Sequence, residues 1–249
     1  MKAVASVAAV FFCAASLAVA SSSRAGSAIP DALLRAASFN SASLSGVLVE
    51  ERHVQFNASA GPAHFSQQND AIVMLEDGEY KHLRYLRIVE NGKVLSPDKV
   101  AEKEAENNAD LQHGKTFFKQ PYDARYLRDY AFTEAPCPCA PHERSIAFVS
   151  QIRDDQHGDG TILLDPVTGR VLSVTYTPNV LPNRASSGTT VETFGEAAPG
   201  VWTIIAIDHE YSGHVAFIRG SGKMIERMDH FQRFSTSYAG MQYLQRASL

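Results

Sequence analysis

The chain has 249 residues, of which 45% are apolar, and a formal net charge of −4 at pH 7. This mild acidity argues against nucleic acid or an anionic membrane surface as the main partner. The length is enough for one large domain or two small ones. No linker and no internal repeat divides the sequence, so a single domain over residues 30–249 is the simpler interpretation.

The N-terminus predicts a secretory signal peptide. It reads MKAVASVAAVFFCAASLAVA, with Lys2 at the start, then an apolar run, then the motif AVA before three serines. The run is short for a transmembrane helix and no later stretch reaches spanning length, so we expect no integral membrane segment after cleavage. Cys13 lacks the small-residue context of a lipidation site. We predict a signal peptide at 1–20, a flexible lead at 21–29, and a periplasmic or secreted mature protein.

The first half of the mature chain predicts one helix, several strands and a second helix. The segment DALLRAAS favours a short helix, and LSGVLVEERHVQF, AIVML and EYKHLRYLRIVE favour strands. Asn91 and Gly92 predict a tight turn because both residues tolerate a positive φ. A helix is expected from Pro97 to Leu111, with Ser96 as its N-cap.

The second half predicts strand after strand, followed by a closing helix. The strand candidates are ARYLRDYAFTE, RSIAFVSQI, TILLD, RVLSVTYT, GTTVETFGE, VWTIIAIDHEY, HVAFIRG and KMIERMDHFQRF, the last three joined by Ser/Gly turns at Ser212-Gly213 and Gly220–Gly222. VWTIIAI is apolar on both faces, which predicts a central strand or one that lines an apolar cavity. The tail STSYAGMQYL favours a helix that packs on the sheet.

Short turns between consecutive strands determine the expected fold class. Parallel neighbours need long crossover connections, so these strands must be antiparallel. We therefore predict an α+β fold that is mostly β, with one large twisted antiparallel sheet and a few helices against it.

The segment EAPCPCAPHER contains the only two cysteines of the mature chain, Cys137 and Cys139. In an oxidising compartment they are each other's default partners, so we predict a local disulfide in a proline-stiffened turn. Intermolecular or redox pairing and ligation of a soft metal are the alternatives. A tetrahedral zinc site would need two further ligands, and only His142 is close in sequence.

Two other polar segments raise the question of a metal or acid–base site. The loop DDQHGDG partly matches a cation loop from Asp155, but His157 occupies a ligand position and the closing carboxylate is missing, which favours a polar hairpin loop. His209, His214 and Asp229 could converge across a hairpin, although strand alternation can place them on opposite faces. No nucleophile elbow, phosphate loop or dinucleotide fingerprint is present, and we expect no catalytic residue set, metal or cofactor.

The order of the elements resembles the periplasmic outer-membrane lipoprotein carrier and lipoprotein-sorting superfamily. The phrases IVENGKVLSP, HGDGTILLDPVTGRV and MDHFQRF look like those of bacterial secreted proteins related to that superfamily, and the resemblance covers about Pro30 to Leu244. It implies a strongly curved antiparallel sheet, an incomplete barrel, with helices on its concave side. It also implies a cavity for acyl chains or other apolar ligands.

These observations predict an exported, non-enzymatic binding protein. Its partner would be a hydrophobic small molecule, a lipid or a lipoprotein, held in the cavity of the curved sheet. Candidate lining residues, chosen by position and apolarity, are Trp202, Ile204, Phe217, Ile218 and Phe231. The alternatives are an envelope interaction or sensor module that holds a protein partner, and an exported metal-dependent enzyme that uses His157, Asp159, His209, His214 and Asp229.

Overall fold

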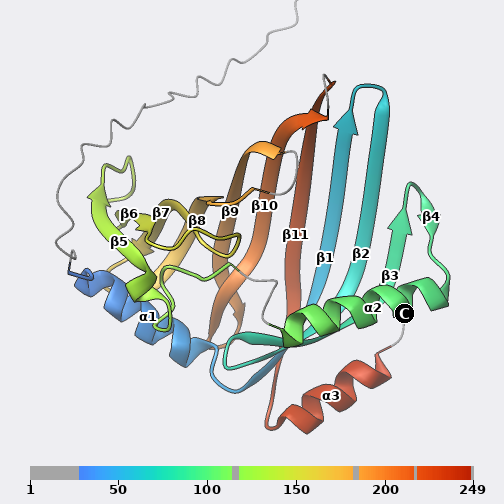
Figure 1. Ribbon diagram of the computed structural model, residues 1–249. Helices are drawn as coiled ribbons and strands as arrows, with labels where there is room; N and C mark the ends of the chain where they lie inside the picture. Colours follow the sequence, from blue (N-terminus) through green and yellow to red (C-terminus); the bar gives the residue numbers. More distant parts are fainter. Residues whose placement is uncertain (1–27, 114–117, 182–184, 216–217, 248–249) are drawn as a thin grey trace, which may run out of the picture.

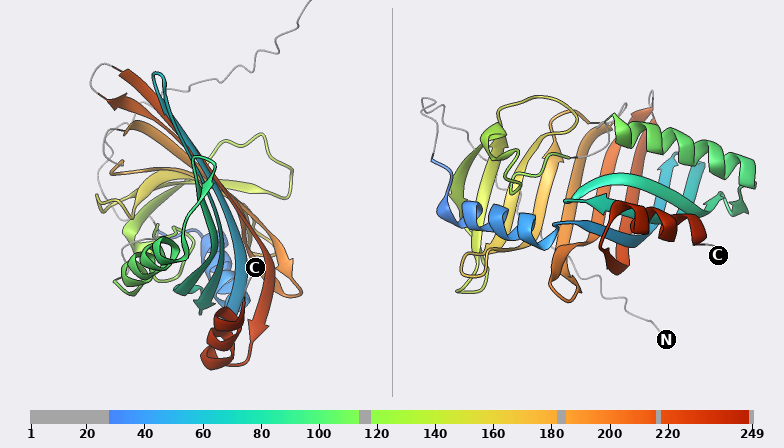
Figure 2. Two further views of the ribbon diagram at one scale, coloured as in Figure 1. Left: turned by 90° about the vertical axis from the view of Figure 1, so that its right-hand side faces the viewer. Right: turned by 90° about the horizontal axis from the view of Figure 1, so that it is seen from below.

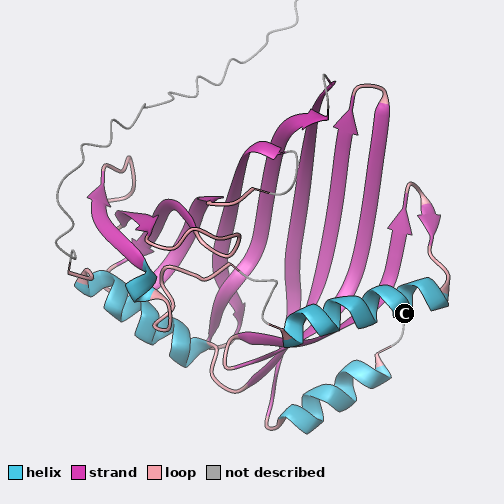
Figure 3. Ribbon diagram, in the orientation of Figure 1, coloured by secondary structure: helices cyan, strands magenta, loops and turns pink. Residues whose placement is uncertain are grey.

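A computed structural model describes residues 28–113, 118–181, 185–215 and 218–247 (Figure 1). The predicted signal peptide lies outside these ranges. The described residues are mostly strand, with three α-helices (Figure 3). The helices are α1 (Asp31–Ser43), α2 (Pro97–Gln112) and α3 (Ser237–Arg246), and a short 3-10 turn, η1 (Leu127–Asp129), precedes β5.

All strands of the described residues belong to one antiparallel sheet of eleven strands, ordered β4-β3-β2-β1-β11-β10-β9-β8-β7-β6-β5. Their bounds are β1 (Val47–Ala60), β2 (Ala63–Glu76), β3 (Glu79–Glu90), β4 (Lys93–Val94), β5 (Tyr130–Ala135), β6 (Arg144–Ser150), β7 (Gly158–Asp165), β8 (Arg170–Pro178), β9 (Ala185–Ala198), β10 (Val201–Val215) and β11 (Ile218–Phe234). The sheet curves without closing, because β4 and β5 remain at opposite edges (Figure 2). The predicted fold class is confirmed.

The chain builds this sheet from two meanders that meet at β1 and β11. From β1 the chain runs outward through β2 and β3 to β4, and from β5 it runs inward to β11. Tight turns explain the first meander: Asp77 and Asn91 have φ of 51° and 49°, and each is followed by a glycine with positive φ. The predicted Asn91-Gly92 turn is thus confirmed.

Two turns predicted in the last third are wrong. Ser212-Gly213 and Gly220–Gly222 lie inside β10 and β11, where Ser212 pairs with Ser221 and Gly213 pairs with Gly220. At Gly220 a Cβ would lie 3.0 Å from the Ser59 carbonyl oxygen of the neighbouring β1, so this glycine fits a close approach of two strands. At Gly188 in the neighbouring β9, a Cβ would lie 2.5 Å from the ring of Tyr211, so the missing side chain makes room for that ring.

The three helices cover different parts of the sheet. Leu33 and Ala36 of α1 pack in a fully buried cluster with Ile162 and Val174. Helix α1 thereby covers the concave face of β5–β8. α3 packs Leu244 against Val47, Val49, Ile72 and Met74 on the opposite, outer face. The two helices therefore lie on opposite faces of the sheet.

The helix α2 covers the edge strand β3. The amide of Asn108 accepts a hydrogen bond from the backbone N–H of Leu83 and donates one to its carbonyl, both at 2.8 Å. Glu104 accepts a further bond of 2.9 Å from the N–H of Tyr85. These side chains satisfy backbone groups that a neighbouring strand would otherwise pair.

Candidate functional site

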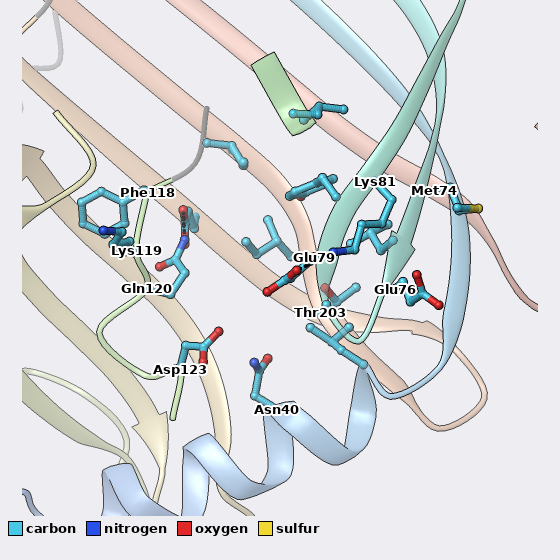
Figure 4. Close-up of a pocket in the computed structure, with 18 of the residues that line it drawn as sticks. Asn40, Met74, Glu76, Glu79, Lys81, Phe118, Lys119, Gln120, Asp123 and Thr203 are labelled. Atoms are coloured by element: carbon cyan, nitrogen blue, oxygen red, sulfur yellow. Dashed lines mark hydrogen bonds and ion pairs between the residues drawn. The ribbon is translucent and has the colours of Figure 1, made fainter. Parts of the chain in front are cut away.

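A cavity of about 720 Å³ lies on the concave face of the sheet (Figure 4). It is bounded by β1–β3, by β9–β11, by residues of α1, α2 and α3, and by the segment 118–126, which lies between α2 and β5 in the chain. A second cavity, of about 790 Å³, lies between β3, α2 and α3. We favour the first as the functional site because charged side chains that are buried in the fold line it and the second has none.

Apolar and aromatic side chains form much of the cavity wall. The ring of Phe118 stacks on Tyr176 with centroids 3.6 Å apart, and Tyr122 meets Phe194 edge-on at 5.4 Å. Further apolar wall residues are Leu75, Ile204 and Ile207. The segment 118–126 thus reaches the cavity through rings that pack on β8 and β9, and it fixes their positions before any ligand arrives.

One end of the cavity holds a compensated cluster of charges around Arg52. Its guanidinium donates to Glu50 and to the hydroxyl of Tyr80, both at 2.6 Å, and lies 3.6 Å from Glu226. Burial raises the pKa of Glu50 above its usual value even though Arg52 pulls it down. Burial also opposes ionisation of Glu226, but His209 and Arg52 outweigh it and hold the pKa of Glu226 below its usual value.

Glu192 on β9 is a third buried carboxyl group, and it is not compensated. Its side chain is 2% exposed, and its Oε1 accepts hydrogen bonds from Gln120 Nε2 at 2.7 Å and from the Tyr176 hydroxyl at 3.4 Å. Its Oε2 has no partner within the described residues, and neither does Gln120 Oε1. Burial raises the pKa of Glu192 to about 7.

The structure places the predicted lining residues in different surroundings. Ile204 lines the cavity. Trp202 packs beside it on the α1 cluster, where its indole N–H donates to the Val171 carbonyl at 2.7 Å. Phe231 is buried in a cluster with Leu48, Leu75, Val201 and Met228. Ile218 lies at the far end of β11 and is 46% exposed, and Phe217 falls outside the described residues.

Cys137 and Cys139 are joined by a disulfide in the turn between β5 and β6. Their Cα atoms are 5.1 Å apart. The bridge lies at the edge of the sheet and is not among the residues that line the cavity.

The histidines and acids considered as an enzyme site lie in separate networks. His157 is buried and contacts Asp154 at 2.6 Å and Asp129 at 3.4 Å. His209 contacts Thr190 at 2.8 Å, inside the cavity region. The remaining three are also apart: Asp159 accepts from the Ser150 N–H, Asp229 lies 3.5 Å from His53, and His214 pairs with Arg219 near the end of β10.

A possible metal-ligand group lies on the outer face of the sheet. Ligand atoms of Glu51, His53 and Asp229 lie within 4.8 Å of one another, and His230 contacts Glu51 and Asp229 at 3.1 Å. Two of the three, His53 and Asp229, are exposed to solvent. Because His53 follows Arg52 on β1, its side chain points away from the cavity.

Sequence reasoning missed Arg52, Gln120, Glu192 and Glu226. The signal for Glu192 was its position two residues before Phe194 in GTTVETFGE, since residues two apart on a strand share a face. Both side chains are buried on the concave face, whereas Thr193 between them is exposed. Gln120 lies in an irregular segment, where no periodicity indicates its direction.

The structure is similar to several solved structures at low sequence identity. A DUF1329 family protein from Desulfovibrio piger is 10% identical, with a TM-score of 0.41, over 88% of this chain and 97% of that one. A LolA superfamily protein from Nitrosomonas europaea is 7% identical, with a TM-score of 0.36, over 83% and 96%. A putative outer membrane lipoprotein-sorting protein domain from Vibrio parahaemolyticus is 11% identical, with a TM-score of 0.39, over 86% and 98%.

The descriptions of two of these proteins name the superfamily that the sequence resembles, and the likeness concerns the fold alone. No protein-family model matches the sequence, and a search of curated proteins finds no match. Within the described ranges, none of the helices combines the length and the apolar character that crossing a membrane requires.

Proposed function

We propose that the mature protein is an exported, non-enzymatic binding protein that holds a lipid, an acyl chain or another hydrophobic ligand in the concave-face cavity. The cavity itself carries this proposal. At about 720 Å³ it falls within the size range of small-molecule sites, and it combines apolar and aromatic walls with a few polar groups. Export to the periplasm or beyond is supported by the leader-like N-terminus.

Two features make the cavity suitable for binding a ligand without catalysing a reaction. Its aromatic wall is already packed, so little ordering cost remains for binding. The histidines and acids that the sequence analysis considered for an enzyme site are dispersed among separate hydrogen-bond networks. Ile204 and Phe194 supply apolar surface on adjacent strands, where an acyl chain would lie.

Lipid extraction and native mass spectrometry of the exported protein test the proposal, followed by titration with a fluorescent lipid probe that has an uncharged head group. We expect co-purified lipid or saturable binding of the probe. Ile204→Arg, which places a charge in the cavity wall, should weaken binding at least about tenfold. Ile152→Arg is the matched control, because Ile152 is exposed outside the cavity, and it should bind as the wild type does.

The result that would overturn the proposal is a folded wild-type protein that contains no lipid and binds no probe. Equal loss of binding in both arginine variants would also count against the cavity as the site. Circular dichroism of each variant separates lost binding from lost folding, and Ile204→Ala gives a second, milder variant that should weaken binding without adding a charge.

A further inference from the structure

Among the described residues, Glu50, Glu192 and Glu226 are largely buried on the concave face, and Arg52 is the arginine that lies between two of them. Glu50 and Glu226 both lie within 3.6 Å of Arg52, at 2.6 Å and 3.6 Å. In the part of the chain that the structure describes, Glu192 has no ion pair, although it is as deeply buried as Glu50, each being 2% exposed. A buried carboxylate is normally matched by a cation, so Glu192 lacks a counterion.

Two buried oxygen atoms lie at this point without a hydrogen-bond donor. They are Glu192 Oε2 and Gln120 Oε1, which belong to side chains already joined by the 2.7 Å bond from Gln120 Nε2 to Glu192 Oε1. Both are acceptors, both belong to residues that line the cavity, and they come from separate elements, β9 and the segment 118–126. Buried acceptors without donors are rare in folded proteins, and a ligand that donates hydrogen bonds would satisfy them.

The basic side chain nearest to Gln120 in sequence does not act as the counterion of Glu192. Lys119 neighbours Gln120, but its Nζ lies 5.7 Å from the centroid of the Tyr126 ring and makes no ion pair with Glu192. Lys81 and Arg125, which also line the cavity, are bound to Glu79, and Arg125 is bound to Asp123 as well. Lys81 and Arg125 are therefore bound to other carboxylates, and Lys119 lies beside the ring of Tyr126.

Aromatic rings surround the carboxyl group. Tyr176 donates its hydroxyl to Glu192, Phe118 stacks on Tyr176, and Tyr122 packs against Phe194 two residues further along β9. The negative faces of aromatic rings attract cations, most strongly where water is excluded. A carboxylate among such rings is a chemical environment that suits an organic ammonium group.

We propose that Glu192 and Gln120 form a headgroup subsite that takes the protonated amine of an amphipathic ligand. This inference rests on the proposed binding function of the cavity and names the class of ligand within it. The ammonium group donates one hydrogen bond to Glu192 Oε2 and another to Gln120 Oε1. The alkyl chain then lies along the apolar wall formed by residues such as Ile204 and Ile207.

Three ligands that share an alkyl chain and differ in their head group test the ammonium subsite: dodecylamine, dodecanol and dodecanoic acid. Calorimetric titration of the purified, delipidated full-length mature protein gives each affinity at one pH near neutrality. We expect dodecylamine to bind most tightly and dodecanoic acid most weakly. Glu192→Gln should lower the dodecylamine affinity at least about tenfold while changing the dodecanol affinity less than about threefold.

Two further variants complete the design. Gln120→Met removes the second free acceptor and should also weaken dodecylamine binding selectively. Glu210→Gln is the matched control, because Glu210 is an exposed carboxylate on β10 that pairs with Lys223. It removes the same charge from the protein and should leave the dodecylamine affinity unchanged.

The outcomes separate this inference from the proposed function. Equal binding of the three ligands, a preference for dodecanol over dodecylamine, or an undiminished amine preference in Glu192→Gln overturns the ammonium subsite and leaves the cavity as a binding site. A folded wild-type protein that binds none of the three overturns the proposed function itself.

Discussion

The two halves of the sheet use the same concave face in different ways. In the closed half, strands β5–β8, this face carries apolar side chains such as Phe148, Ile162 and Val174, and α1 seals it. In the open half, β9–β11 with β1–β3, the face carries Arg52, Glu192 and other polar groups around the cavity. The concave face of one continuous sheet therefore carries an apolar core in the closed half and a cavity in the open half. We expect the closed half to supply the stability that offsets the cost of burying charges in the open half.

Truncation of a core residue in the closed half should have the largest effect. Phe148 is 1% exposed, and Phe148→Ala should lower the free energy of unfolding by about 4 kcal/mol through lost burial and the cavity it leaves. Urea denaturation measures the difference. Val149→Ala is the control on the same strand, since Val149 is 54% exposed, and should cost less than about 0.5 kcal/mol. Equal costs would show that the closed half is not the stable part of the sheet.

In the open half, removal of the buried Arg52 should cost somewhat less. Arg52→Met leaves Glu50 and Glu226 buried without their cation, which should lower the free energy of unfolding by about 3 kcal/mol at neutral pH. Arg227→Met, at an exposed arginine paired with Asp208, should cost at most about 1 kcal/mol. If both variants unfold at the same urea concentration, the Arg52 cluster does not contribute to folding.

The pH dependence of stability should reveal the uncompensated Glu192. Its pKa is raised from 4.5 to about 7, so between these values the folded state keeps a proton that the unfolded state has released. The free energy of unfolding therefore falls as pH rises through this window, by on the order of 2 kcal/mol from this group. Gln120, Tyr176 and Glu226 are the polar or charged groups that act on it.

Glu192→Gln should remove that contribution, so the variant should lose less stability than the wild type between about pH 5 and about pH 8. Denaturation curves at both pH values, with Glu210→Gln as a control, measure the difference. Parallel pH profiles for wild type and Glu192→Gln would contradict the buried, unpaired state of this carboxyl group.

The smallest expected effect concerns the helix on the outer face. Thr236 is the N-cap of α3, and its hydroxyl accepts a hydrogen bond from the Ala239 N–H at 3.2 Å. Thr236→Ala should lower the free energy of unfolding by about 1 kcal/mol, and Thr236→Ser should restore most of it. Neither change should alter binding, because Thr236 is not among the residues that line the cavity. A change in ligand affinity would show that the two faces are coupled.

More of the fold than of the candidate site could be predicted from the sequence. Asn91-Gly92 and the period-two strands specify an antiparallel meander, because turn chemistry and alternation are local properties. Facing is less local: shifts of register in β10 between Val201 and Trp202, and between Ile204 and Ala206, change which side chains meet the cavity. No shift separates Trp202 from Ile204, so the two share a face of β10, and Trp202 lies farther along the strand on the α1 cluster.

Glu192 and Gln120 were missed for a different reason, because the sequence signal for Glu192 is weak and Gln120 has none. Glu192 lies in a strand whose other residues are mostly small or polar, where a glutamate suggests the solvent face. Its burial depends on Gln120, which is distant in sequence and belongs to a segment without periodicity. Only the folded chain brings the two side chains together.

Because α2 covers the edge strand β3, it limits the tendency of the molecule to self-associate through that edge. Asn108 offers Leu83 one donor and one acceptor, as a residue of an adjacent strand would. Displacement of α2 therefore uncovers a row of peptide groups prepared to pair. Under mildly denaturing conditions, the first contact between two copies would be a shared strand edge, and a helix that is poor in apolar residues guards against it.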